Sequence, residues 1–300
     1  MRGIHALVIS LLINPLPALA QDFNPFILDA VKIVAERKGG GYDINKSFTR
    51  NLSYGSGVIE ASNPPSTMCV AAVVEVMVEA IKLYSKQHPE IYSKIPLSSW
   101  TKGNLTSLRA NFYLYEGSKS KGTAHTLERF GIGKQLKFSQ LKPGDFINFN
   151  RSTDKPSGHS VIFIHYLNSK GERVADFNDS VAGFRYFSAQ MAQGGEPAGM
   201  GYRNGFFGPC PASIPKPRDC KIIRTDNSYL FNAGRMSDPK DWEYENAVSK
   251  VKAGVRAAFE GAYPGESRGF IDKLTALELN RELDPATAQA EMFDGSTPEE

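Results

Sequence analysis

The chain of 300 residues has few of the residues from which metal and nucleic-acid sites are built. It has five histidines and three cysteines, with no C-x-x-C, H-x-H or H-E-x-x-H spacing, so no zinc motif is recognisable. The formal net charge of +3 is small and the basic residues are scattered, which argues against nucleic acid as a partner. The same charge neither favours nor excludes an anionic surface, such as a cell wall, as a partner. No internal repeat or long low-complexity tract is present.

Long apolar runs are also lacking. After residue 20, no segment approaches the roughly 18 apolar residues that a membrane helix needs. Residues 1–20 have one early charge, a short apolar stretch, two prolines and then Ala18-Leu19-Ala20 before Gln21, which is the pattern of a secretory signal. The alternative, a mature N-terminal helix, would be broken by the prolines. The sequence predicts a secreted or periplasmic protein with no stable membrane insertion after signal removal.

Three cysteines leave one without a partner if two of them pair. Cys210 and Cys220 bracket the proline-rich loop "PASIPKPRD", and in an oxidising compartment we expect them to form a disulfide. Such a loop would contribute about 3 kcal/mol by chain entropy. A metal site is the alternative, but no nearby histidine supports it. Cys69 would then be a free thiol.

The periodicity of apolar residues predicts helices first and strands afterwards. Residues 24–41 have helical spacing and end in glycines, and residues 67–84 are apolar on nearly all faces, as in a buried core helix. From residue 141 the period changes to two, and four segments predict an antiparallel meander: "LKPGDFINFN", "GHSVIFIHYL", "RVADFND" and "GFRYFSAQ". We expect a glycine-rich loop over 194–210, one more strand over 227–236, helices over 238–262 and 266–283, and a polar tail. The fold class is α+β.

The start of the predicted helix 67–84 places a thiol where it can react. With Ser66 or Thr67 as N-cap, Cys69 lies in the first turn, where free amides and the macrodipole favour a thiolate and lower the thiol pKa. The same amides can donate to an oxyanion. A thiolate also needs a proton shuttle, usually histidine. His159 follows the turn "PSG" and opens a predicted strand, so it is the candidate base. The other histidines of the mature chain are expected to be solvated or structural: His88, His125 and His165.

A catalytic histidine is oriented by a third polar group on a neighbouring strand. The next predicted strand carries Asp176 and Asn178, two apart and so on one face. Taken alone, they would be turn residues capping a hairpin. Together with Cys69 and His159 they would complete a catalytic set, whose order along the chain is thiol, then imidazole, then carboxylate or amide. Gln190, at the end of the following strand, is the reserve candidate.

Together these segments resemble the papain-like cysteine hydrolases of the NlpC and CHAP type, over roughly residues 50 to 190. The resemblance lies in "YGSG", in Cys69 at a first helical turn, in "LKPGDFINF" and in "GHSVIFI". The chain has Met68-Cys69-Val70 where NlpC members usually have Asp-Cys-Ser, and its glycine-rich loop and C-terminal helices have no counterpart in the minimal domain.

The resemblance implies a papain-like core in which a buried helix carries the nucleophile against an antiparallel sheet. Cys69 would be the nucleophile and His159 the base. Asp176 and Asn178 would occupy the positions of the orienting acid and the asparagine, and Tyr54 would contact substrate. Residues 21–235 would form the hydrolase domain and residues 236–300 a helical C-terminal extension.

The function expected is an exported hydrolase that cleaves an amide bond, chiefly in peptidoglycan stem peptides, and needs no cofactor. Its partner would be a cell-wall peptide substrate. One alternative is a catalytically inactive binding module on the same fold, with Cys69 merely buried. The other is a metal-dependent hydrolase using three histidines and an aspartate: His125, His159, His165 and Asp176.

Overall fold

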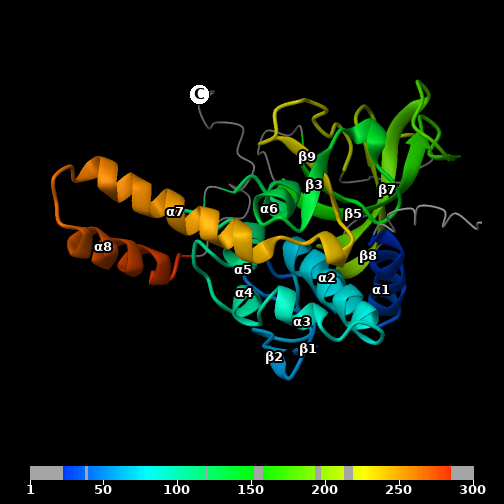
Figure 1. Ribbon diagram of the computed structural model, residues 1–300. Coiled ribbons are helices and arrows are strands. Elements are labelled where there is room, and N and C mark those ends of the chain that lie inside the picture. Colours follow the sequence, from blue (N-terminus) through cyan, green and yellow to red (C-terminus); the bar gives the residue numbers. More distant parts are fainter. Residues whose placement is uncertain are drawn as a thin grey trace, which may run out of the picture.

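An antiparallel sheet of seven strands forms the centre of the computed structural model (Figure 1). The structure describes residues 23–37, 40–115, 117–118, 120–151, 158–192, 197–212 and 219–284. In spatial order the strands are β3 (Gly133–Leu136), β9 (Phe231–Met236), β4 (Phe146–Asn150), β5 (Gly158–Asn168), β7 (Val181–Gln190) and β8 (Gly199–Phe206), and β6 (Arg173–Val174) pairs with β5. The fold is mixed α+β with an antiparallel sheet, as predicted.

Within the seven-stranded sheet, most strands lie where the alternation of apolar residues predicts them, but β3 and β8 were not expected. The glycine-rich segment predicted to be a loop contains β8, which pairs with β7 along its whole length, from Gly199 opposite Gln190 to Phe206 opposite Gly183. The neighbouring strand supplies the hydrogen bonds, and this context outweighs the low strand propensity of glycine.

Eight helices pack beside the sheet or extend from it in the described part of the chain. Around the sheet are α1 (Asn24–Glu36), α2 (Cys69–Ser85), α3 (Ile91–Lys94), α4 (Ser98–Thr101), α5 (Leu108–Phe112) and α6 (Thr123–Arg129), followed near the C-terminus by α7 (Tyr244–Ala262) and α8 (Arg268–Asn280). Two short 3-10 turns, η1 (Phe138–Gln140) and η2 (Pro239–Asp241), and a hairpin of β1 (Leu52–Tyr54) and β2 (Gly57–Ile59) complete the description.

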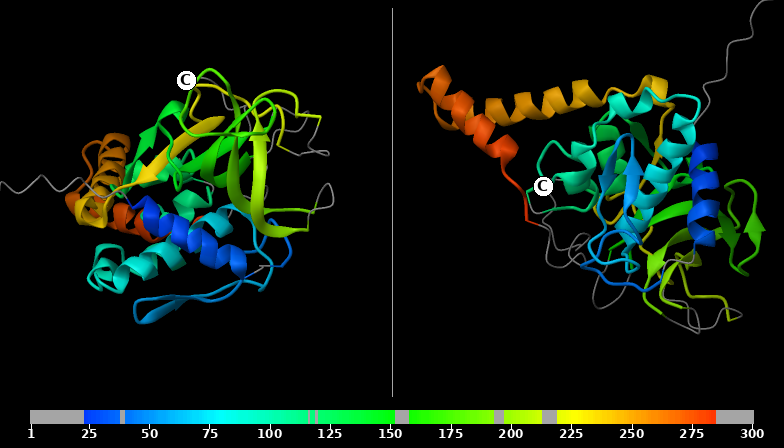
Figure 2. Two further views of the ribbon diagram at one scale, coloured as in Figure 1. Left: turned by 90° about the vertical axis from the view of Figure 1, so that its right-hand side faces the viewer. Right: turned by 90° about the horizontal axis from the view of Figure 1, so that it is seen from below.

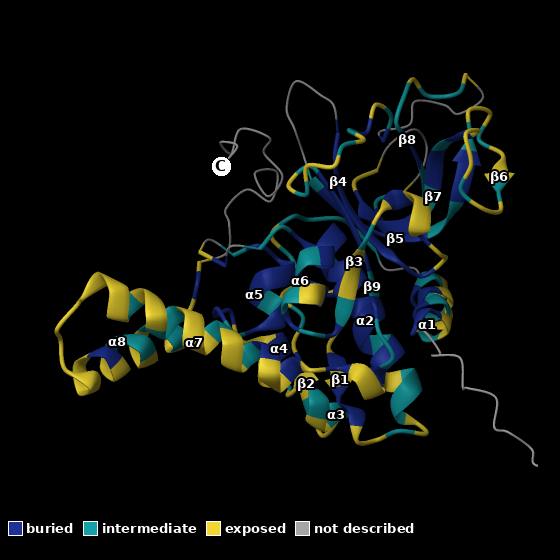
Figure 3. Ribbon diagram, turned by 45° about the horizontal axis from the view of Figure 1, so that its top comes forward, coloured by how far each residue is buried: buried dark blue, intermediate teal, exposed yellow. Residues whose placement is uncertain are grey.

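The two faces of the sheet bury different layers. Side chains alternate along β5, so Ile162 belongs to the layer with α1 and α2, whereas Val161 and Phe163 belong to an aromatic layer on the other face. Helix α2 packs on β5 and β7 and is buried along most of its length, as Figure 3 shows. This burial is what the nearly continuous apolar girth of residues 67–84 predicts.

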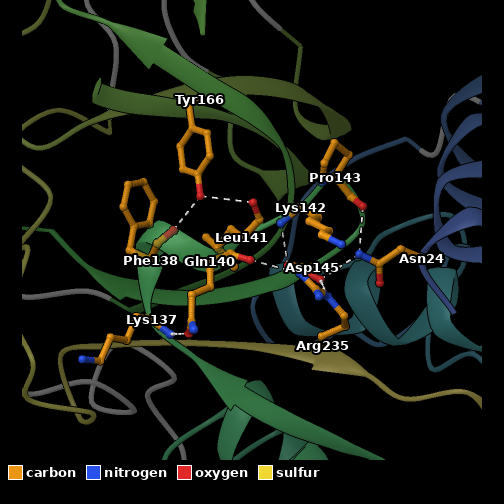
Figure 4. Close-up of polar contacts among 10 residues, drawn as sticks. All are labelled: Asn24, Lys137, Phe138, Gln140, Leu141, Lys142, Pro143, Asp145, Tyr166 and Arg235. Atoms are coloured by element: carbon orange, nitrogen blue, oxygen red, sulfur yellow. Dashed lines mark hydrogen bonds and ion pairs between the residues drawn. The ribbon is translucent and has the colours of Figure 1, made fainter. Parts of the chain in front are cut away.

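The Pro-Gly-Asp turn before β4 is held by a fully buried carboxylate (Figure 4). Asp145 accepts hydrogen bonds from Arg235 (Nη2–Oδ2 2.6 Å), from Asn24 (Nδ2–Oδ1 2.7 Å) and from the backbone of Lys142 (N–Oδ2 2.7 Å). These contacts join the start of α1, the turn and β9. Asp145 therefore has a structural part in the motif "LKPGDFINF".

Helices α7 and α8 form a hairpin that projects away from the sheet (Figure 1 and the right panel of Figure 2). Most of its surface is open to solvent, as Figure 3 shows, and Leu277 is 61% exposed. Among the described residues, no helix is both long enough and apolar enough to cross a membrane. The predicted signal at residues 1–20 and the polar tail at 293–300 lie outside the described residues.

Candidate active site

Cys69 lies in the first turn of α2, as the sequence predicts, but the helix begins at Cys69 itself and its cap differs from the one expected. The N-cap is Met68, whose sulfur accepts a hydrogen bond from the backbone of Ala71 at 3.2 Å. Thr67 instead donates its hydroxyl to the carbonyl of Ser47 at 2.6 Å. Cys69 therefore lies in the first helical turn, where the amides are free of intrahelical partners.

The sulfur of Cys69 is surrounded by hydrogen-bond donors yet shielded from water. The residue is 3% exposed, and burial raises the pKa of its thiol. The backbone N–H groups of Ser160 and Val70, the charge of Arg151 and the hydroxyl of Tyr42 lower the same pKa without overcoming the burial. The lowered thiol pKa predicted from the helix terminus is therefore wrong for this structure, because the loss of solvation outweighs the donors.

His159 lies at the start of β5 as predicted, and it directly precedes Ser160, whose N–H faces the Cys69 sulfur. Its imidazole is 2% exposed and meets the rings of Phe149 and Tyr186 edge-on, with centroids 5.5 and 5.7 Å away. These two rings belong to the aromatic layer. The fold thus brings the backbone at His159 and Ser160 to the thiol, while the imidazole packs on the aromatic side of β5.

Asp219, which the sequence analysis did not single out, interacts electrostatically with His159. Asp219 is 2% exposed; it accepts a hydrogen bond from Arg151 (Nε–Oδ1 2.5 Å) and another from the hydroxyl of Tyr186. Burial alone would raise the pKa of this carboxyl, but the charges of Arg151 and His159 and the two hydrogen bonds hold it below its ordinary value. Arg151 interacts electrostatically with both Cys69 and Asp219, so it links the thiol to the acid.

The position of Asp219 depends on a disulfide. Cys210 and Cys220 are joined, and Cys69 is free, as predicted. Asp219 directly precedes Cys220, and its carbonyl accepts from the backbone of Phe206 at 2.8 Å, which fixes this loop to the end of β8. The adjacency of an acidic residue to a cross-linked cysteine was the only signal in the sequence, and it says nothing about His159.

Asp176 and Asn178 do not lie near His159, so the orienting role expected for them is wrong. Strand β6 pairs only at residues 173 and 174, opposite residues 167 and 166 of β5, which are seven or eight positions beyond His159. At about 3.3 Å per residue this corresponds to about 25 Å. Both side chains are exposed in the turn after β6, where Asn178 Oδ1 accepts from the backbone and the hydroxyl of Ser180. They serve the turn, as their residue types alone would suggest.

Tyr54 is also in a structural position and not beside the thiol. Its hydroxyl donates to the carbonyl of Ile95 at 2.8 Å, and its ring packs on Tyr92 with centroids 4.9 Å apart. The tyrosine whose hydroxyl reaches Cys69 is Tyr42, twelve residues earlier, on a segment that bridges to Thr67. The place predicted for Tyr54 at the nucleophile is therefore occupied by Tyr42.

The reserve candidate, Gln190, is buried at the end of β7 and accepts a hydrogen bond from Tyr186 at 3.3 Å. It therefore shares the hydroxyl of Tyr186 with Asp219. Among the other histidines, His125 accepts from the backbone of Lys121 at 3.3 Å, and His88 is half-buried beside Glu90. Within the described ranges no group of three or more His, Cys, Asp or Glu side chains could hold a metal ion.

No family model, curated protein or solved structure matches this chain. The site is therefore interpreted from its own geometry and from the motifs in the sequence.

Proposed function

We propose that the protein is an exported, thiol-dependent hydrolase that cleaves an amide bond, chiefly in peptidoglycan stem peptides. The observation that carries the proposal is the convergence at the start of β5: the sulfur of Cys69 meets the N–H of Ser160, the residue after His159, and Arg151 links it to Asp219. A helix that carries a thiol and packs on an antiparallel sheet also agrees with a papain-like core. The motifs around residues 54, 69, 145 and 159 support the substrate class.

In the proposed reaction, Cys69 attacks the carbonyl carbon of the amide while His159 accepts the thiol proton. Because the imidazole packs on the aromatic side of β5 in this structure, this step requires the imidazole to turn towards the thiol. Because burial keeps the thiol protonated in the free protein, the proton is transferred during substrate attack and not beforehand. Backbone N–H groups at the start of α2 stabilise the oxyanion. His159 then donates the proton to the leaving amine, which leaves a thioester on Cys69. Water hydrolyses the thioester to a carboxylate and restores the thiol.

Asp219 acts in this scheme as a positioning residue for His159, since its carboxylate interacts electrostatically with the imidazole. Export is supported by the predicted signal at residues 1–20 and by the disulfide between Cys210 and Cys220, which persists in oxidising compartments. No cofactor enters the proposed steps.

The test is to incubate purified peptidoglycan sacculi with the wild type and with Cys69→Ala, and to analyse the soluble products by mass spectrometry. The wild type is expected to release fragments that carry new amine and carboxylate ends, and Cys69→Ala none. Asp176→Ala is the matched control, because Asp176 is exposed and remote from His159. Release by Cys69→Ala at the wild-type rate, or no release by the wild type, would reject the proposal.

A second candidate function, a catalytically inactive binding module on the same fold, is favoured by the burial of Cys69 and of His159, which are 3% and 2% exposed. The two candidates differ in the reactivity of the thiol. A hydrolase needs Cys69 to react with iodoacetamide in the folded protein and to react more slowly after His159→Ala. A binding module predicts modification of Cys69 only after unfolding, with sacculi bound but not cleaved.

A further inference from the structure

A pocket of about 570 Å³ lies at the edge of the aromatic layer, away from Cys69. Its wall is formed by β3, η1 and the start of β9, together with residues 224–228 and the turn after β6. The volume is in the range of small-molecule sites in proteins. None of the functional residues predicted from the sequence lines this pocket.

The pocket combines aromatic rings with basic side chains. Phe138, Phe177 and Phe231 supply apolar surface, and Lys137 and Arg224 bring positive charge. Asp226 is the one acidic side chain among the described lining residues, so the formal charge of the lining is positive. Such a surface fits a ligand with an apolar body and an anionic group.

Arg224, one of the lining residues, packs over three aromatic rings. Its guanidinium carbon lies 5.8, 5.5 and 5.4 Å from the ring centres of Phe138, Phe177 and Phe207. This packing over aromatic rings holds the guanidinium in place by cation–π attraction. Within the part of the chain that the structure describes, Arg224 forms no hydrogen bond or ion pair, so none of these residues uses its N–H donors.

A fixed guanidinium with unused donors matches a carboxylate, which accepts two parallel N–H bonds. We infer that this pocket binds a small carboxylic acid with an apolar body, its carboxylate on Arg224 and its apolar part against Phe138, Phe177 and Phe231. Lys137 adds a second, more flexible positive charge. The polar residues Ser228 and Asn232 border the same pocket and offer hydrogen bonds to groups near the carboxylate.

The pocket lies on the same face of the sheet as His159 but two strands away. Phe231 of β9 is paired with Phe149 of β4, and Phe149 is paired with His159 of β5. At about 4.8 Å between strands, the backbones of Phe231 and His159 are about 10 Å apart. The inference depends only on binding, so it can hold or fail independently of hydrolysis at Cys69.

The experiment is isothermal titration of the intact, oxidised protein with N-acetylphenylalanine and with its neutral amide. The acid is expected to bind at one saturable site, and the amide at least about tenfold more weakly, because a charge-assisted hydrogen bond pair is lost. Arg224→Gln should weaken binding of the acid by a similar factor, and Arg224→Lys by less. Arg268→Gln, which changes an exposed arginine on α8, should leave binding unchanged.

Location is checked by NMR in the same titration: backbone amides at residues 137–139 and 224–228 should shift with the acid. Equal binding of acid and amide, unchanged binding after Arg224→Gln in a protein with wild-type circular dichroism, or shifts confined to other residues would overturn the inference. Because Arg224 is exposed, its substitution is not expected to prevent folding.

Discussion

Replacing Asp219 by asparagine should destabilise the protein far more than the same replacement at Asp272. Both carboxylates pair with an arginine at an N–O distance of 2.5 Å, Asp219 with Arg151 and Asp272 with Arg256. The side chains of the first pair are 4% and 2% exposed, and those of the second are 33% and 50% exposed. The N–O distance is matched between the pairs and burial is the main difference, although Tyr186 also donates to Asp219 and Glu260 also accepts from Arg256.

Asparagine keeps the size of the side chain but removes the charge that balances the buried guanidinium of Arg151. Losing one partner of a buried ion pair typically costs about 3–5 kcal/mol, so the free energy of unfolding should fall by that amount in Asp219→Asn. At Asp272 water solvates the arginine, and no measurable change is expected. The assay is guanidinium chloride unfolding of the oxidised proteins at neutral pH, followed by circular dichroism and tryptophan fluorescence.

If Asp219→Asn does not fold, the double variant Arg151→Met with Asp219→Leu replaces the test, because it leaves no unpaired charge and should recover most of the stability. In that variant the hydroxyl of Tyr186 retains Gln190 as an acceptor; the two atoms are 3.3 Å apart in the wild-type structure. Equal effects at Asp219 and Asp272 would refute the reasoning, since they would mean that the buried cluster is solvated like the surface pair.

Three further outcomes are expected. The pKa of Asp219 is lower in the folded protein than the ordinary carboxyl value of about 4, so its ionisation stabilises the fold above that pH and the stabilisation is lost as the pH falls below it. Acid unfolding, followed by circular dichroism against pH, should therefore be less steep in Asp219→Asn. Cys220→Ser, which opens the disulfide, should lower the free energy of unfolding by about 3 kcal/mol in the same denaturant assay; an unchanged value would contradict this. Tyr42→Phe should slow iodoacetamide modification of Cys69 by about tenfold, because a hydrogen bond to the thiolate is lost, whereas Tyr54→Phe should not change it.

The regular elements could be predicted because their signals are local. The period-two pattern in "GHSVIFIHYL" and the apolar girth of residues 67–84 depend only on neighbours in the chain, and both segments form the expected elements. The disulfide was also predictable, since Cys210 and Cys220 are the two cysteines close enough in sequence to close a short loop. Strand β8 was not, because its pairing with β7 and not its composition makes it a strand.

The candidate site was only partly predictable, because its remaining members meet through long-range contacts. Asp219 reaches Arg151 and Tyr186 across 68 and 33 residues of sequence, along a route set by β8 and the disulfide. Asp176 has the right residue type and spacing, but the ladder between β5 and β6 ends after two pairs and leaves it in a turn.

The pKa of the Cys69 thiol likewise depends on the three-dimensional structure. The helix terminus lowers the pKa of Cys69 and burial raises it, and only the packed structure gives the balance between them. The sequence predicts the effect of the helix terminus, but it does not predict how completely the thiol is buried.

The most direct test of the proposed function is to look for the thioester on Cys69. The protein is mixed with soluble muropeptides, quenched in acid within seconds and analysed by intact-mass and peptide-mapping mass spectrometry. We predict an adduct on the peptide that contains Cys69, removed by neutral hydroxylamine, absent from Cys69→Ala and reduced in His159→Ala. Cleavage of muropeptides by Cys69→Ala, or an intact substrate with no adduct on the wild type, would contradict the proposed function.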